Sequence, residues 1–152
     1  MAYTLEALVG RNEFNQEILL RFPSGKLVSL HGDVWLIPLT GNLISELSKV
    51  TEVGEVQLLP ELQSASAGAI LLTQRLSQNG KVAYLEAEFF GGVGGQASAG
   101  WQNGELIFQP RQAVNAINQA LQWLGVLRDQ EHDEFDMIGL GRHRNTEAWA
   151  QQ

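Results

Sequence analysis

The alternation of apolar and polar residues predicts a β-hairpin in the middle of the chain. Lys81–Phe90 carries only apolar residues at its odd-numbered positions from 83 on, and a half-polar set between them. This pattern favours a strand with one face on a core and the other in water. Asn103-Gly104, a strong signal for a tight turn, separates two further strand-like segments, Gln96–Gln102 and Glu105–Phe108. We therefore expect a glycine-rich antiparallel hairpin around residues 81–109.

Apolar residues at helical spacing predict about three helices. Thr40 is a suitable N-cap for a helix over Gly41–Val50, where aliphatic residues recur on one side. A second helix is expected from about Ser66 to Leu76. The third, Arg111–Leu124, follows a proline, carries an apolar stripe and stops at Gly125.

Short apolar runs in the first third of the chain predict an antiparallel meander. Close spacing and intervening turn residues mark three of these runs: Ile18–Phe22, Lys26–Leu30 and Val34–Leu39. Tyr3–Ala7 alternates weakly and is either a further strand or an irregular lead-in. At the other end, Trp149 is too apolar to stay in water, so we expect the tail to pack back on the body. Because strands and helices are segregated rather than alternating, the order predicts an α+β fold with a mainly antiparallel sheet.

Length and charge narrow the class of protein. With 152 residues, of which 44% are hydrophobic, the chain is expected to form a single domain over 1–152. Ten basic and seventeen acidic residues give 10 − 17 = −7, which opposes nucleic-acid binding and suits a basic protein partner. The absence of cysteine excludes disulfides and thiolate metal sites and fits a reducing cytoplasm. No secretory signal opens the sequence, and no apolar run approaches the ~20 residues of a membrane helix. We therefore expect a cytoplasmic protein without membrane contact.

Aromatic residues beside the glycine-rich turn form the first candidate site. Tyr84, Phe90 and Trp101 lie on or near the predicted strands, and Gly94 and Gly95 belong to the connection between them. Aromatic side chains that a core does not use are frequent anchors of protein interfaces. The competing interpretation places the same rings in the core. Where they are exposed, the hairpin offers a binding edge for another protein.

Glu86 and Glu88 form the second candidate, a pair of carboxylates on one strand. At i and i+2 their backbones are roughly 6–7 Å apart, near the separation at which two carboxylates share acid and base roles. Desolvation by a neighbouring aromatic ring would raise the pKa of one of them. Alternating glutamates are also typical of the wet face of a strand. The sequence therefore allows two interpretations of these glutamates, a catalytic pair and the solvated face of a strand.

A cluster of histidines and acids near the C-terminus is the third candidate. His132, Asp133, Asp136 and His143 combine imidazole with carboxylate oxygens, a set that suits zinc, manganese or iron. The two histidines would act as ligands or as bases. Their spacing matches no established metal motif. The alternative is an exposed acidic loop whose charges pair with nearby arginines, namely Arg128, Arg142 and Arg144.

Two function classes fit these observations. The first is a small acidic, non-catalytic domain that binds another protein, for example as an inhibitor or neutraliser of a basic partner. Such a domain needs no cofactor, and it permits an oligomer without demanding one. The second is a small metal-dependent hydrolase that uses the C-terminal His/Asp cluster and one divalent transition metal. Because no catalytic motif is complete, the sequence favours the binding domain over an enzyme.

Overall fold

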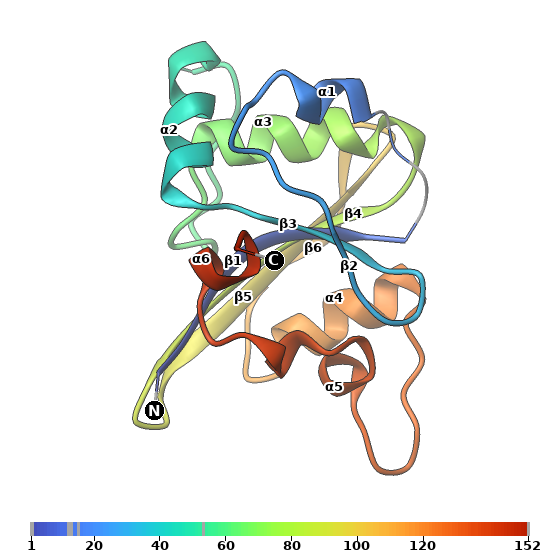
Figure 1. Cartoon of the computed structure of the whole chain (residues 1–152). Helices are drawn as coiled ribbons and strands as arrows, with labels where there is room; N and C mark the ends of the chain where they lie inside the picture. The colour runs from blue at the N-terminus through green and yellow to red at the C-terminus, as the bar shows by residue number, and fades with distance from the viewer. Residues whose placement is uncertain (1, 12–13, 15, 53, 152) are drawn as a thin grey trace.

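A six-stranded antiparallel sheet organises the structure, a computed structural model that describes residues 2–11, 14, 16–52 and 54–151. The strands follow one another in the order β2-β3-β1-β4-β5-β6. Every pairing between neighbours is antiparallel. Helices lie on both faces of the sheet, which Figure 1 shows on edge. The chain thus has an α+β fold with an antiparallel sheet, as its sequence predicts.

The element bounds show where the sequence pattern was too short to be informative. The strands are β1 (Ala2–Gly10), β2 (Val28–Ser29), β3 (Trp35–Pro38), β4 (Val82–Phe90), β5 (Val93–Gln102) and β6 (Glu105–Gln112). The α-helices are α1 (Gln16–Leu20), α2 (Gly41–Val50), α3 (Ala67–Leu76), α4 (Ala116–Leu124), α5 (Glu134–Ile138) and α6 (Thr146–Trp149), and the 3-10 helices are η1 (Ser77–Asn79) and η2 (Leu140–Arg142). The described residues thus form six α-helices rather than about three. The additional ones, α1, α5 and α6, have only four or five residues, too few to establish a period. Within this part of the chain, no helix is long and apolar enough to cross a membrane.

Each face of the sheet packs on its own core. On one face, residues of α1, α2 and α3 cover a cluster that contains Tyr84 and Trp101. On the other face, residues of α4, α5 and α6 cover a cluster that contains Ala83, Leu85 and Trp149. Successive residues of β4 therefore alternate between two cores. The expectation that one face of this strand lies in water is wrong for Val82 to Glu86, all of which are buried, because helices and a loop cover that half of the strand.

Two predicted helices are confirmed, and Thr40 is the N-cap of the first as expected, whereas Ser66, expected as the first residue of the second, is its N-cap. Thr40 Oγ1 accepts a hydrogen bond from the Leu43 N–H at 3.2 Å where α2 begins. Ser66 Oγ accepts one from the Ala69 N–H at 3.1 Å where α3 begins. Such caps satisfy N–H groups that the first turn of a helix leaves unpaired. The limits of both helices therefore follow from local sequence.

The third predicted helix begins later than expected, because β6 is longer than expected. The sequence predicts helix from Arg111, but Arg111 and Gln112 pair with Ser98 and Ala97 of β5. Their backbone groups are thereby engaged in the sheet, and α4 begins only at Ala116. Pro110 is compatible with this extension because β6 is the last strand in the order, where a missing N–H breaks no ladder.

The N-terminal third departs furthest from the prediction. Ile18–Phe22 was expected to be a strand, but α1 occupies Gln16–Leu20 and a turn follows. The strongest deviation is β1, of which the sequence marks only Tyr3–Ala7. This strand runs from Ala2 to Gly10 and pairs with β4 along its whole length, so it lies in the middle of the sheet.

The C-terminal tail packs back on the sheet, as predicted. Trp149 is fully buried. The Thr4 N–H donates to the carbonyl of Arg144 at 2.9 Å, and the Glu6 N–H donates to Thr146 Oγ1, also at 2.9 Å. Because β3 pairs only with the second half of β1, the tail occupies the edge that β3 leaves open.

Candidate functional site

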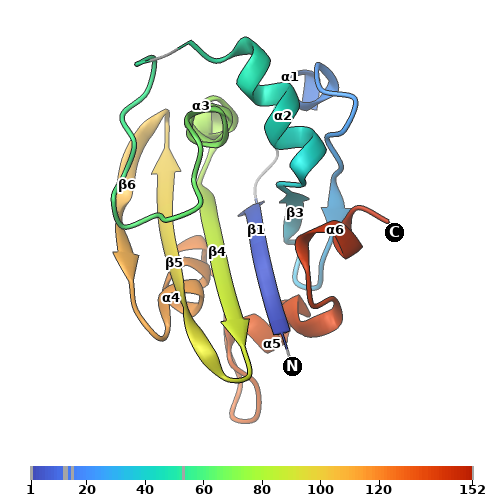
Figure 2. The same ribbon diagram turned by 90° about the vertical axis from the view of Figure 1, so that its left-hand side faces the viewer.

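A groove lies at the hairpin end of β4 and β5, on the face that α2 and α3 cover further along the sheet. Its volume is about 640 Å³, within the range of roughly 300–1,000 Å³ that ligand pockets usually have. The lining comes from the loop before α3 with Gln63 and Ser64, from the hairpin, and from the segment after β6 with Val114. Figure 2 shows the loop before α3 crossing in front of the sheet. Three segments distant in sequence therefore meet around this hollow.

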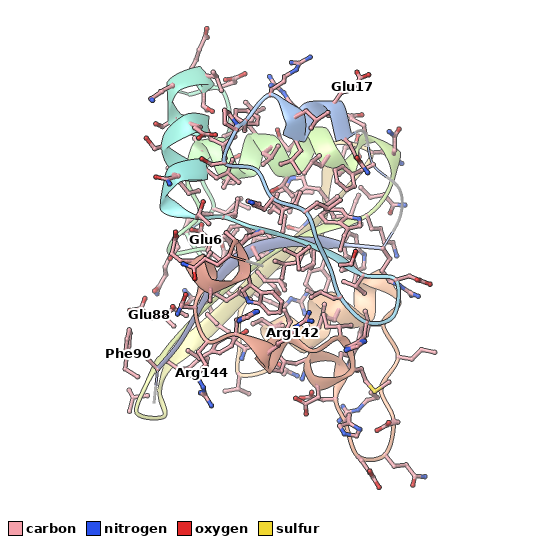
Figure 3. All side chains as sticks on the ribbon, viewed as in Figure 1. Glu6, Glu17, Glu88, Phe90, Arg142 and Arg144 are labelled. Atoms are coloured by element: carbon pink, nitrogen blue, oxygen red, sulfur yellow. The ribbon has the colours of Figure 1, made fainter. Side chains whose placement is uncertain are left out.

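The register of β4 and β5 determines which side chains face the groove. Directly opposite residues of an antiparallel pair extend from the same face, and the pairs here are Glu86 with Ala97, Glu88 with Gly95 and Phe90 with Val93. At two of these positions β5 contributes small residues, Gly95 and Ala97. They form the floor of the groove between the loop and the hairpin tip, where no large side chain fills the space. Figure 3 shows Glu88 and Phe90 projecting to the same side of the molecule.

Glu86 is a buried carboxylate with three hydrogen-bond donors. Its Oε2 accepts from the Gln63 N–H at 2.9 Å, and its Oε1 accepts from the Ser64 N–H and the Tyr84 hydroxyl, both at 3.0 Å. These bonds fix the loop against the sheet. By contrast, the side chain of Glu88 is exposed and forms no hydrogen bond or ion pair with the described residues. Glu86 therefore builds the groove wall, whereas Glu88 is available to a ligand.

Glu6 of β1 lies opposite Glu86 and completes a carboxylate pair beside the groove. The Tyr84 hydroxyl is 2.6 Å from Glu6 Oε2 as well as 3.0 Å from Glu86 Oε1. Burial raises the pKa of Glu6 to about 7, and the charge of Glu86 adds to this effect although the Tyr84 hydrogen bond opposes it. Since one hydroxyl carries one proton, it cannot fully satisfy two charged carboxylates. A proton on Glu6 removes this conflict.

The rim of the groove is apolar, and the charged residues that line the groove are all acidic. Phe90, Val93 and Val114 are 55%, 77% and 95% exposed, which is unusual for side chains of this size. Among the lining residues in the described part of the chain, two are glutamates and none is basic. The groove thus offers negative charge at its centre and apolar contacts at its edge.

Of the seven candidate residues that the sequence places in the hairpin, five converge at this groove and two do not. Glu86, Glu88, Phe90, Gly94 and Gly95 all line it. Tyr84 and Trp101, the other two predicted binding residues, are buried in the core under α3, so neither side chain is on the surface. Tyr84 instead acts on the site from below, through its hydrogen bonds to the two glutamates.

The C-terminal cluster is not assembled as a metal site. The His132 ring lies 3.2 Å from Asp129 on an exposed loop, and Asp133 caps α5 by accepting from the Asp136 N–H at 2.9 Å. His143 packs its ring edge-on against Trp149. Within the described ranges, no three His, Asp or Glu side chains come together closely enough to hold a metal ion. The four candidate residues therefore serve a loop, a helix cap and a packing contact.

Sequence reasoning missed several residues that line the groove or lie beside it. Glu6 gave no signal, because its role depends on the pairing of β1 with β4. Gln63 and Ser64 act through their backbone N–H groups, which any residue type supplies. Val93 and Val114 were detectable in principle, since each is a large aliphatic residue in an otherwise small or polar segment.

Comparisons of this chain with protein-family models, with curated proteins and with solved structures found no match. The groove itself therefore carries the functional argument. It combines a free carboxylate, a floor of small residues and a rim of exposed aliphatic and aromatic side chains.

Proposed function

We propose that the protein is a non-catalytic domain that binds a basic segment of a partner protein in the groove at the β4–β5 hairpin. The observation that carries this proposal is the combination of exposed Glu88, an apolar rim and a lining without basic residues. A lysine or arginine side chain would lie over Gly95 with its charge near Glu88. Apolar residues of the same partner segment would contact Phe90 and Val93. An inhibitor or neutraliser of a basic protein would use such a surface.

Charge favours a basic protein over the other occupants of such a groove. The chain has a net charge of −7, so a second copy and a nucleic acid are both repelled. A basic partner is attracted over a distance, which raises the association rate. The exposed rim supplies the apolar contacts that usually provide most of the binding energy. A cytoplasmic location agrees with a chain that lacks cysteine.

A catalytic use of the same carboxylates has less support. Glu86 already accepts three hydrogen bonds that fix the loop before α3, which leaves it poorly suited to exchange protons with a substrate. The metal-dependent alternative lacks a gathered ligand set among the residues that the structure describes. We therefore propose neither activity.

The test uses a defined basic probe: a fluorescent peptide that alternates arginine and lysine with leucine. An acidic peptide with glutamate at the charged positions is the negative probe. Glu88→Gln should weaken binding of the basic peptide about 3- to 10-fold, because one charge contact is lost. Gly95→Leu should weaken it by about tenfold or more, because a Cβ at this position extends into open space and a leucine there would fill the floor.

The matched control is Glu131→Gln, which removes the same charge from an exposed loop outside the groove. If this variant weakens binding as much as Glu88→Gln, the peptide senses net charge alone and the groove is not its site. An association rate that stays constant between low and high salt would also contradict the proposal, since electrostatic steering falls steeply with ionic strength.

A further inference from the structure

A second, smaller hollow lies on the opposite face of the same end of the sheet. It has a volume of about 300 Å³, at the lower limit of roughly 300 Å³ for pockets that hold drug-sized ligands. This size suits one long side chain better than a whole ligand. Its walls come from β1, β4, β5, the N-terminal part of α4, and the start of α5. It is therefore built from regular elements and not from a single loop.

Aromatic rings and one carboxylate define the chemistry of this hollow. Tyr3, Phe89 and Phe135 line it, and Tyr3 packs edge-on against Phe135 with ring centroids 5.6 Å apart. Asp133 is the charged residue among its lining residues in the described part of the chain. A cation beside aromatic rings is attracted by their negative faces, and the attraction increases when water is excluded. Rings and a carboxylate together favour a cation that is apolar over much of its length.

Asp133 is held in position and in its charged form. Its Oδ1 accepts from the Asp136 N–H and its Oδ2 from the Asn118 side-chain amide, both at 2.9 Å. Burial alone would raise the pKa of Asp133, but these two hydrogen bonds and the charge of Arg128 outweigh it and lower the pKa. Each carboxylate oxygen keeps a second lone pair that points away from these donors. The carboxylate can thus accept a further donor without losing its present ones.

The two hollows lie back to back across the strand ends. Ala87, Phe89, Gln96 and Val114 contribute to both of them. Val114, which is almost completely exposed, therefore forms a ridge between the groove and the smaller hollow. A partner that lies along this ridge reaches both hollows at the same time.

We propose that the hollow bounded by Tyr3, Phe89, Phe135 and Asp133 binds an arginine side chain of the same basic partner whose other basic residue occupies the groove. This inference rests on the proposed function, because the partner that supplies the arginine is the one that occupies the groove. Arginine fits better than lysine, because its planar guanidinium stacks on rings and is less strongly hydrated than an ammonium. Two contacts on opposite faces also fix the orientation of the partner on the strand ends.

The test is an NMR titration of the full chain with three small probes: the Nα-acetyl methylamides of arginine, lysine and norleucine. Arginine should shift the backbone amide signals of Asn118 and Phe135 saturably. Norleucine, which has no charge, should produce at least tenfold weaker effects, and lysine should lie between the two. Asp133→Asn should weaken arginine binding by about fivefold or more; it keeps α5 intact because asparagine is as good an N-cap as aspartate. Phe89→Leu should weaken it as well, since it keeps an apolar wall and removes a ring.

The outcomes separate this inference from the proposed function. Glu131→Gln serves as the charge-matched control and should leave the arginine titration unchanged. If the basic peptide binds the groove while arginine shifts no signal in the hollow, or shifts it equally in Asp133→Asn, the second site is refuted and the proposed function stands. If the peptide fails in the groove assay while arginine still binds the hollow, the proposed function fails and the hollow accepts arginine from another source.

Discussion

At the scale of single residues, Glu6 is where pH acts most directly on this protein. Its carboxyl group is largely buried, faces the carboxylate of Glu86, and shares the one hydroxyl of Tyr84 with it. With a pKa of about 7 it is half protonated near neutrality. The protonation of a single side chain therefore changes the charge next to Glu86, a residue of the groove wall, within the physiological range of pH.

Glu6→Gln should flatten the dependence of stability on pH. The folded-state pKa of about 7 exceeds the ordinary value of 4.5, so the folded chain binds more protons than the unfolded chain between these two values. The free energy of unfolding should therefore fall as pH rises through this window, by on the order of 3 kcal/mol. Glutamine still accepts from Tyr84 and does not titrate, so this loss should disappear. Urea denaturation at pH 5 and at pH 8 measures both slopes.

The control for this measurement is Glu131→Gln, which reports the general effect of removing one negative charge. A Glu6→Gln variant that loses as much stability between pH 5 and pH 8 as the parent chain would show that Glu6 ionises at its ordinary pKa. The carboxylates of Glu6 and Glu86 would then not repel each other strongly enough to hold a proton on Glu6.

At the scale of elements, the β4–β5 hairpin depends on one of its glycines far more than on the next. A Cβ on Gly94 would lie 1.8 Å from the carbonyl oxygen of Glu88, and its φ of 156° lies in a region that side chains disfavour. A Cβ on Gly95 would meet nothing within 4 Å. The two neighbouring glycines thus have different roles: Gly94 allows β5 to approach the backbone of β4, and Gly95 leaves the floor of the groove open.

Gly94→Ala should destabilise the chain by about 1–3 kcal/mol, because the backbone must shift to relieve both the clash and the disfavoured dihedral angle. Gly95→Ala should change stability by less than about 0.5 kcal/mol. Chemical denaturation compares the two, and hydrogen exchange should show faster exchange at the hairpin only for Gly94→Ala. Equal stability of the two variants would mean that the hairpin tolerates a shift of β5 against β4.

Elements could be predicted from sequence wherever their cause is local. Thr40 and Ser66 cap α2 and α3 by reaching only three residues ahead, so the start of each helix depends on local sequence. The start of α4 was misplaced, because residues 111 and 112 pair with β5 and the sequence does not reveal that partner. β1 was recognised only in part for the same reason. Its position between β3 and β4 depends on tertiary contacts, which the local sequence does not encode.

The candidate site divides in the same way. Glu86, Glu88, Phe90, Gly94 and Gly95 were found together because one hairpin carries them all. Tyr84 and Trp101 lie in the core, which is the second of the two interpretations that the sequence left open. The sequence could not decide between them, since strand alternation assigns residues to a face but does not tell whether a helix covers that face. His132 and His143 were grouped by sequence proximity, but they belong to an exposed loop and to a packing contact against Trp149.

At the scale of the whole molecule, the tail and the first strand form one unit. Trp149 is buried against the sheet, and the segment before it supplies hydrogen bonds to the free edge of β1. The indole Nε1 has no hydrogen-bond partner within the described residues. The contribution of this side chain to stability therefore comes from packing and from the contacts of its ring with Arg142 and His143, not from a hydrogen bond of the indole.

Trp149→Ala should lower the free energy of unfolding by about 3–5 kcal/mol, because it leaves a large cavity in the core under α6. Trp149→Phe should cost much less, since it keeps an aromatic ring and loses no hydrogen bond. Urea denaturation of both variants measures the difference. A loss below about 1 kcal/mol in Trp149→Ala would mean that the tail contributes little to the stability of the sheet.

The contact between β1 and the tail also has a consequence for synthesis on the ribosome. Glu6 and Thr146 are 140 residues apart, and their contact forms only after both have been translated. At about 5–20 residues per second, the free edge of β1 waits roughly 7–28 s for the segment that covers it. During this time the first half of β1 presents an edge that the tail does not yet cover, a template for pairing with other chains. A chaperone that covers this edge during translation would therefore raise the yield of folded protein more than one that acts after release.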